Sequence, residues 1–313
     1  MKKVSKITEL KKNKSPFLKK GDVIDIIAPS SACTPAELKY AISWVKKQGY
    51  VPRVSKDLLQ PVDFLANTDL KRFKDLKKAL ESKTSKAVWC LRGGYGALRL
   101  VPDLLRLKKQ KNKIFIGLSD ITILHQFLIQ KWNWKTIHGP VLSRTMSEKK
   151  RQTDYDELFQ LLTGEKTALE FKNLIPLNTS ALKNKKMITA AVMGGNLCTF
   201  CSLLGTGLQP KTKGYFLFFE DISERGYKVD RMLNQLSQAG IFQKCKGIFF
   251  GDFINSNETN GKNLVWSTIE NFFRYHSIQV YAGIESDHSE KQRPLYLNTK
   301  AELFKNTLKV HSS

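Results

Sequence analysis

The sequence lacks any apolar run near the roughly 18 residues that a membrane-spanning helix requires. A secretory signal is also missing, because the segment from Met1 to Lys20 holds eight lysines but no apolar stretch and no small-residue cleavage site. We interpret this segment as a loose basic lead-in to the first strand. These absences favour a cytoplasmic protein that does not bind a membrane.

Cysteine is scarce, and its number, five, is odd, which suits reduced thiols better than a disulfide framework. Cys198 and Cys201 have the spacing of a redox motif or of half a zinc site, but no second ligand pair follows at a suitable distance. Both fall on an apolar, helix-like segment. We therefore expect them to be core thiols, and we expect neither a metal nor a cofactor.

Acidic residues are few, with 28 against 52 lysines and arginines, so the formal net charge is +24. Such an excess can attract polyanions. However, the lysines are scattered, and arginine, the better reader of phosphates and bases, is the minority cation. A lysine-rich solvated surface without nucleic-acid binding is the favoured interpretation. A non-enzymatic polyanion-binding protein is the alternative from another class.

The 313 residues, of which 41% are hydrophobic, are enough for two domains with a substantial core. In the first half, apolar strand-like runs alternate with helical stretches, of which the clearest are residues 35–48 and 69–81. This alternation predicts an α/β domain with a parallel sheet, whose ligands collect at the carboxyl ends of the strands. The loops at that edge are residues 29–31, 92–96 and 118–122.

The pattern weakens after Glu148, in a charge-rich helix, a break at Gly164 and a lysine-rich loop. We expect an N-terminal α/β domain over residues 16–165, a linker over 166–188 and a C-terminal domain over 189–313.

The run from Ile114 to Thr122 predicts a strand, a tight turn at Ser119 and a helix start. A serine at this place exposes its hydroxyl beside helix-start N–H groups that can stabilise an oxyanion. The run resembles a nucleophile elbow but lacks the second glycine of Gly-x-Ser-x-Gly. Ser119 could therefore instead be a simple helix cap.

A serine nucleophile needs a base and an acid that orients the base. Glu220 and His288 each lie at the end of an apolar, strand-like run, as Ser119 does. Side chains alternate along a strand, so only one of Glu220 and Asp221 is expected to face the site. Taken singly, a histidine placed like His288 is more often a loop histidine, and an acid placed like Glu220 is more often a surface acid or a helix cap.

The chain resembles the LD-carboxypeptidase family of serine peptidases, which includes murein tetrapeptide carboxypeptidase and the microcin C self-immunity protein. The resemblance rests on motifs in a fixed order over nearly the whole chain. They are Gly21-Asp22, Ala28-Pro29-Ser30, Arg92-Gly93-Gly94-Tyr95-Gly96, Gly117-Leu118-Ser119-Asp120-Ile121-Thr122, His138-Gly139-Pro140, Gly194-Gly195-Asn196-Leu197, Glu220-Asp221, Tyr227 with Asp230-Arg231-Met232-Leu233, Gly251-Asp252-Phe253 and His288.

The resemblance implies that Ser119 is the nucleophile, His288 the base and Glu220 the orienting acid. It places the oxyanion hole at the backbone N–H of Asp120 and of Gly93 or Gly94. It also implies a flavodoxin-like or Rossmann-like N-terminal domain, a smaller, β-rich, swivelling C-terminal domain, and a homodimer. Arg92, Tyr95 and His138 are weaker candidates for substrate contacts.

One departure from the family concerns the base, because Asp287-His288 stands where the family usually has Gly-His. The added carboxylate could raise the pKa of the histidine or change how its loop sits. The expected reaction is cleavage of the L,D amide bond before the terminal D-alanine of a murein tetrapeptide, in peptidoglycan recycling. The nearer alternative is hydrolysis of a peptidyl or aminoacyl nucleotide, as in the microcin immunity branch.

Overall fold

The structure is a computed structural model that describes residues 17–312 and, for 146–152, the backbone alone. Most of the basic lead-in segment expected from the sequence therefore lies outside the described residues. Among the helices that are described, none has the length and apolarity to cross a membrane.

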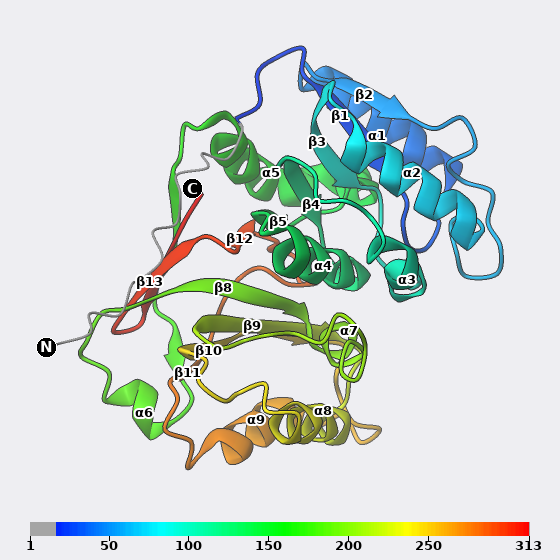
Figure 1. Cartoon of the computed structure of the whole chain (residues 1–313). Coiled ribbons are helices and arrows are strands. Elements are labelled where there is room, and N and C mark those ends of the chain that lie inside the picture. Colours follow the sequence, from blue (N-terminus) through cyan, green and yellow to red (C-terminus); the bar gives the residue numbers. More distant parts are fainter. Residues whose placement is uncertain (1–16, 313) are drawn as a thin grey trace, which may run out of the picture.

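The N-terminal domain is built on a six-stranded sheet with the order β12-β5-β4-β3-β1-β2 (Figure 1). Five of its strands are parallel, and β12 runs antiparallel to β5 at the edge. Their bounds are β1 (Val23–Ile27), β2 (Val51–Val54), β3 (Ser85–Cys90), β4 (Ile114–Gly117), β5 (Thr136–His138) and β12 (Leu295–Leu297). The associated α-helices are α1 (Pro35–Lys47), α2 (Asp69–Glu81), α3 (Val101–Leu104), α4 (Thr122–Trp132) and α5 (Glu148–Thr163).

The C-terminal domain is built on an eight-stranded sheet with the order β6-β14-β13-β8-β9-β10-β11-β7. Its centre is parallel and its flanks are antiparallel. The strands are β6 (Ala168–Phe171), β7 (Ile175–Pro176), β8 (Ile188–Asn196), β9 (Tyr215–Ile222), β10 (Gly247–Ile254), β11 (Val280–Ala282), β13 (Lys300–Phe304) and β14 (Thr307–His311). The α-helices are α6 (Thr179–Leu182), α7 (Leu197–Cys201), α8 (Gly226–Gln238) and α9 (Val265–Phe273).

Local sequence signals fix the first helices. At α1, the Thr34 side chain accepts a hydrogen bond from the Glu37 N–H while the Glu37 carboxylate accepts one from the Thr34 N–H, which is a capping box. At α2, Thr68 accepts from the N–H of Lys71, and the helix has the predicted bounds, 69–81. The predicted parallel-sheet domain followed by a second, sheet-rich domain is confirmed.

Two features differ from the expected domain boundaries. Residues 166–188 are not a bare linker, because β6, β7 and α6 lie within them and both strands join the C-terminal sheet. In addition, β12 leaves the C-terminal half of the chain and joins the N-terminal sheet, where Tyr296 pairs with Ile137. Both are pairings between distant segments, which no local pattern announces.

Helix α4 follows Ser119 and lies between the two domains, as Figure 1 shows. Residues 122–129 of this helix are all buried, the polar His125 and Gln126 included. Gln126 donates to the carbonyl of Gly194 on β8, and Gln130 donates to the carbonyl of Leu208. The helix that directly follows the nucleophile candidate thus contacts both domains.

Candidate active site

Ser119 occupies a strained turn between β4 and α4. Its φ of 69° lies in the left-handed region that residues with a Cβ seldom adopt. The turn also needs Gly117, because a Cβ there would lie 2.4 Å from a methyl carbon of Ile121. This is the conformation of a nucleophile elbow, and it is not the extended conformation of an ordinary helix cap.

The carboxylate of Asp120 ties the Ser119 turn to the neighbouring loops. It accepts hydrogen bonds from the hydroxyl of Ser30 at 2.6 Å and from the N–H of Ala97 at 2.8 Å. The N–H of Ser31 in turn donates to the carbonyl of Gly93. The three loops that the sequence placed at one sheet edge therefore do meet there.

Gly93 lies against the nucleophile candidate so closely that a Cβ there would be 2.7 Å from the Cβ of Ser119. In the described part of the chain, neither the N–H of Gly93 nor that of Asp120 donates to a protein acceptor. Two N–H groups flanking a serine hydroxyl are thus available to an external oxygen.

Arg72 was not singled out from the sequence, yet its buried guanidinium holds two of these loops together. It donates to the carbonyl oxygens of Pro29 and Gly96, and also to Asn67 and Asp69. The only signal in the sequence is its position four residues before Leu76, which puts an arginine on the buried side of α2.

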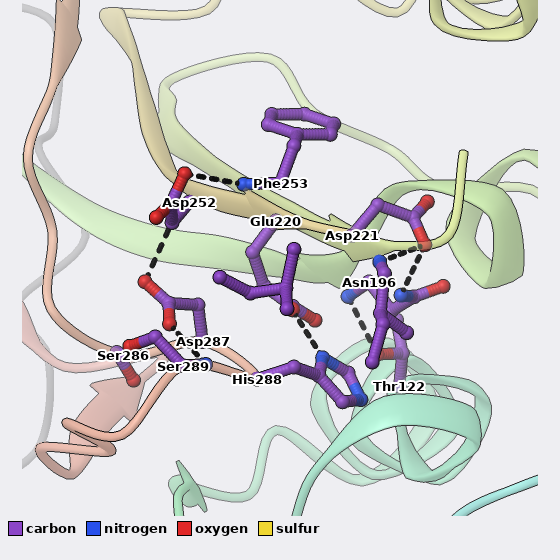
Figure 2. A network of polar contacts seen from close by, with 12 residues as sticks. Thr122, Asn196, Glu220, Asp221, Asp252, Phe253, Ser286, Asp287, His288 and Ser289 are labelled. Carbon is purple, nitrogen blue, oxygen red and sulfur yellow. Dashed lines mark hydrogen bonds and ion pairs between the residues drawn. The ribbon is translucent and has the colours of Figure 1, made fainter. Parts of the chain in front are cut away.

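Glu220 and His288 form a buried pair at the ends of C-terminal segments. The imidazole Nδ1 lies 2.5 Å from a carboxylate oxygen of Glu220, and the Glu220 side chain has no exposed surface (Figure 2). Burial alone would lower the pKa of His288, but the charge of Glu220 and the hydrogen bond to it raise the pKa above its ordinary value of 6.5. The arrangement can orient the ring and stabilise its protonated form.

Asp221 faces away from this pair, as the alternation of side chains along β9 requires. Its carboxylate accepts hydrogen bonds from the side-chain amide of Asn196 and from the N–H groups of Cys198 and Ile222. Burial, and then the charge of Glu220, raise the pKa of Asp221 to about 7. Glu220 alone of the two acids contacts the imidazole.

Asp287 also points away from the imidazole, as seen in Figure 2. Its carboxylate accepts from the N–H of Asp252 at 2.9 Å and from the N–H of Ser289 at 2.7 Å. Of the two effects considered for this departure from the family, the geometry favours the second, in which Asp287 sets the path of the loop that carries His288.

Ser119 and His288 line one cavity of ≈ 340 Å³. The other residues that line this cavity are Glu37, Arg92, Gly93, Gly94, Leu118, Val141, Ser143 and Arg144. The structure therefore brings Ser119, His288 and, behind the imidazole, Glu220 to one place. Arg144, which the sequence did not single out, also donates to the carbonyl of His288.

Two weaker candidates lie elsewhere. His138 is fully buried and has no surface in the cavity; its Nε2 is 3.1 Å from the carbonyl oxygen of Ser286, so it supports the loop of His288 instead of contacting a ligand. Burial lowers the pKa of His138 well below its ordinary value. Tyr95 is exposed beside Gly94 and packs edge-on against Phe64.

The cysteine pair is only partly as expected. Cys201 is buried, but Cys198 is exposed, because the short helix α7 turns it toward solvent. Among the residues that the structure describes, no group of three His, Cys, Asp or Glu side chains is arranged to hold a metal ion.

Comparisons with known proteins match two long segments of the sequence to one family. Residues 24–139 match the model of the LD-carboxypeptidase N-terminal domain, and residues 189–303 match that of the C-terminal domain. A Rickettsia conorii protein that is named as a carboxypeptidase is 39% identical over 245 residues, which cover 77% of this chain and 75% of that protein. A Bacillus subtilis protein that is named as a murein peptide carboxypeptidase is 35% identical, with coverage of 77% of this chain and 75% of that protein.

Solved structures show the same fold. A muramoyltetrapeptide carboxypeptidase from Oxalobacter formigenes superposes with a TM-score of 0.79 at 26% identity, covering 92% of this chain and 98% of that one. The microcin C7 self-immunity protein MccF superposes with a TM-score of 0.82 at 18% identity, covering 95% and 98%.

Proposed function

Since this chain belongs to the LD-carboxypeptidase family, we propose that it is a serine peptidase that removes the terminal D-alanine from murein tetrapeptides. One observation carries the proposal. Ser119, strained at a strand-to-helix turn, lines the same cavity as His288, and the Nδ1 atom of His288 is hydrogen-bonded to the buried Glu220. A nucleophile, a base and an orienting acid are the minimal set for acyl transfer through a serine.

In the proposed reaction, the Ser119 hydroxyl attacks the carbonyl carbon of the L,D amide bond, and His288 accepts the hydroxyl proton. Glu220 stabilises the imidazolium that forms. The proton then passes to the departing amine, D-alanine leaves, and the tripeptide remains bound to Ser119 as an ester. Water, deprotonated by His288, hydrolyses this ester and releases the tripeptide.

The developing oxyanion would be held by the N–H of Asp120 and by that of Gly93, with Gly94 as the neighbouring alternative. Support comes from the close approach of Gly93 to Ser119 and from the absence of protein acceptors for these two N–H groups in the described residues.

A carboxypeptidase must also recognise a terminal carboxylate, and a guanidinium is well suited to bind one. Arg92 and Arg144 both line the cavity, and we assign Arg92 as the first anchor because it is exposed, whereas Arg144 is half-buried and donates to the carbonyl of His288. R92Q should raise KM far more than it lowers kcat. It should not weaken binding of a tetrapeptide whose terminal carboxylate is amidated.

Murein peptide is the better supported substrate. Relatives named as carboxypeptidases, one of them named for murein peptide, share 35–39% of their residues with this chain over three quarters of their length. The microcin immunity protein shares the fold at 18% identity, which says nothing about substrate.

The test is D-alanine release from a purified murein tetrapeptide. We expect release by the wild-type protein, none by S119A, and near-normal release by S143A, which removes another serine hydroxyl from the same cavity. A fluorophosphonate should label Ser119 alone, as read by mass spectrometry. A folded wild-type protein that releases no D-alanine would refute the proposed substrate, and labelling of another serine would refute the proposed nucleophile.

We further propose that the enzyme works in the cytoplasm as a homodimer. The five unpaired cysteines fit a reducing compartment. Sedimentation velocity on the purified protein would test the dimer, and fractionation of cells with an antibody would test the compartment.

A further inference from the structure

A second cavity, nearly twice the size of the first, lies behind the loop that carries His288. It has a volume of ≈ 650 Å³, and we call it the rear cavity. Its apolar walls come from β7 and the residue after it, from α9 and from the end of β11. The main side chains are Ile175, Leu177, Trp266 and Ile284. Ile175 is 60% exposed, so this wall is open to a ligand.

The rim of the rear cavity is acidic in a chain whose net charge is +24. Three exposed acids line it, namely Asp252, Glu270 and Glu290. Within the described residues, none of these three carboxylates forms an ion pair. Lys291 also lines the cavity, but its ammonium is paired with Glu285 at 2.7 Å. Uncompensated negative charge therefore surrounds an apolar hollow.

The rear cavity shares its wall with the candidate active site. Asp287 and Ser289 line it, while His288 between them lines the other cavity. Gly251 also lines it, and a Cβ there would lie 3.1 Å from the Cβ atoms of both Glu220 and Asp287. Figure 2 shows the two faces of this loop, with His288 toward Glu220 and Asp287 toward Asp252.

We propose that the rear cavity binds a short apolar peptide bearing a lysine or arginine side chain, and that its occupancy changes the setting of His288 through the loop of residues 285–291. The proposal goes beyond the hydrolytic activity and does not depend on it.

The chemistry of the walls selects this ligand. Pockets of about 300–1,000 Å³ hold small ligands, so there is room for two or three residues. Apolar side chains can cover Ile175 and Leu177, while a cation can meet the free carboxylates. Trp266, packed edge-on against Phe253 at 5.8 Å, can also receive a cation on its ring.

The test measures binding without turnover. Acetyl-Leu-Lys-Leu-amide, which has no free carboxylate, is titrated into the S119A protein by calorimetry, beside its glutamine and glutamate analogues. The affinity should fall in the order lysine, glutamine, glutamate. E270Q and E290Q should each weaken the lysine peptide by about threefold and leave the glutamine peptide unchanged.

The matched control is E81Q, which removes an exposed carboxylate from α2 in the other domain and should change nothing. In nuclear magnetic resonance spectra, the lysine peptide should shift the imidazole signal of His288 and not that of His311. Equal affinities for the three peptides would overturn the binding site, and so would a lysine-peptide affinity that is unchanged in the E270Q/E290Q double variant. An unmoved His288 signal at saturation would overturn the coupling.

A dimer that dissociates in the E270Q/E290Q double variant would show that a second copy of the chain fills the rear cavity, which also overturns the proposal. Because the assay uses a non-substrate and an inactive protein, its failure leaves the proposed hydrolysis untouched.

Discussion

Replacing Glu220 by glutamine tests the proposed site most directly. Glutamine keeps the size of the side chain and an oxygen that can accept from the Nδ1–H of His288, but it removes the negative charge. Glu220 is fully buried, so no solvent replaces that charge. The change therefore acts on the proton affinity of the imidazole and on its tautomer, with little effect on packing.

The expected loss in kcat is on the order of 10³–10⁴-fold, as for the amide replacement of the acid in other serine triads. Two features of the geometry place it near the upper end of this range. The Nδ1 atom of His288 lies 2.5 Å from a carboxylate oxygen of Glu220, and this carboxylate is the main group that offsets the lowering of the His288 pKa by burial.

The pH dependence has a definite sign. In the wild type, the pKa of His288 is raised above 6.5, so the acidic limb of kcat/KM should lie above that pH, because the base must be neutral. In E220Q, burial remains as the main influence on the pKa of His288 and lowers it, so the acidic limb of kcat/KM should move below pH 6.5. In the wild type, the Glu220–His288 pair adds stability that is fully present below pH 6.5 and is lost as the pH rises through the raised pKa of His288. In E220Q, the pKa of His288 should lie below 6.5, so the stability of this variant should increase as the pH rises toward 6.5.

The assay combines pH profiles of tetrapeptide hydrolysis with urea unfolding between pH 5 and 8 for both proteins. D221N is the control, because this neighbouring acid faces the other way and its pKa is already about 7. We expect its kcat to stay within about tenfold of the wild type, since it loses hydrogen bonds but not the charge beside His288. An E220Q protein with wild-type kcat and an unmoved acidic limb would refute the role of Glu220.

Three further outcomes are expected. G93A should lower kcat by about 10²-fold or more, because its Cβ would displace Ser119 and the oxyanion donor, and the overlap with the Leu118 carbonyl should also lower the unfolding free energy by about 1–3 kcal/mol; normal turnover would contradict the assigned oxyanion hole. R72M should lower the unfolding free energy by about 3–5 kcal/mol in urea, because several carbonyl oxygens and Asp69 lose their buried partner; a loss under about 1 kcal/mol would show that the loops hold without it. D287N should lower kcat by about tenfold without moving the acidic limb, because this carboxylate positions the loop and faces away from the ring; a shifted limb would mean that it acts on the imidazole charge instead.

Much of the site was predictable because its signals are local. The cap at Thr68 and the apolar stripe that follows set α2 within a few residues of chain. The glycine and serine at the end of β4 mark a tight turn in the same way. The alternation of side chains along β9 separated Glu220 from Asp221, and the family resemblance, not the periodicity, paired Glu220 with His288.

What the sequence could not supply depends on contacts between distant segments. The pairing of β12 with β5 and the strands within 166–188 arise from tertiary packing. The burial of Arg72 and His138, and the exposure of Cys198, depend on which neighbours cover them. The orientation of Asp287 is decided by N–H groups at the end of β10 and in its own loop, which a one-dimensional pattern does not place.

The return of β12 to the first sheet means that the polypeptide is interlaced. His288 lies between a segment anchored in one sheet, β11, and one anchored in the other, so its loop is tethered at both ends. A swing of the two halves is therefore limited by the reach of the loop between Ala282 and Leu295 for as long as β12 stays paired with β5. On the ribosome, the sheet that bears Ser119 stays without its edge strand β12 until the chain is almost finished.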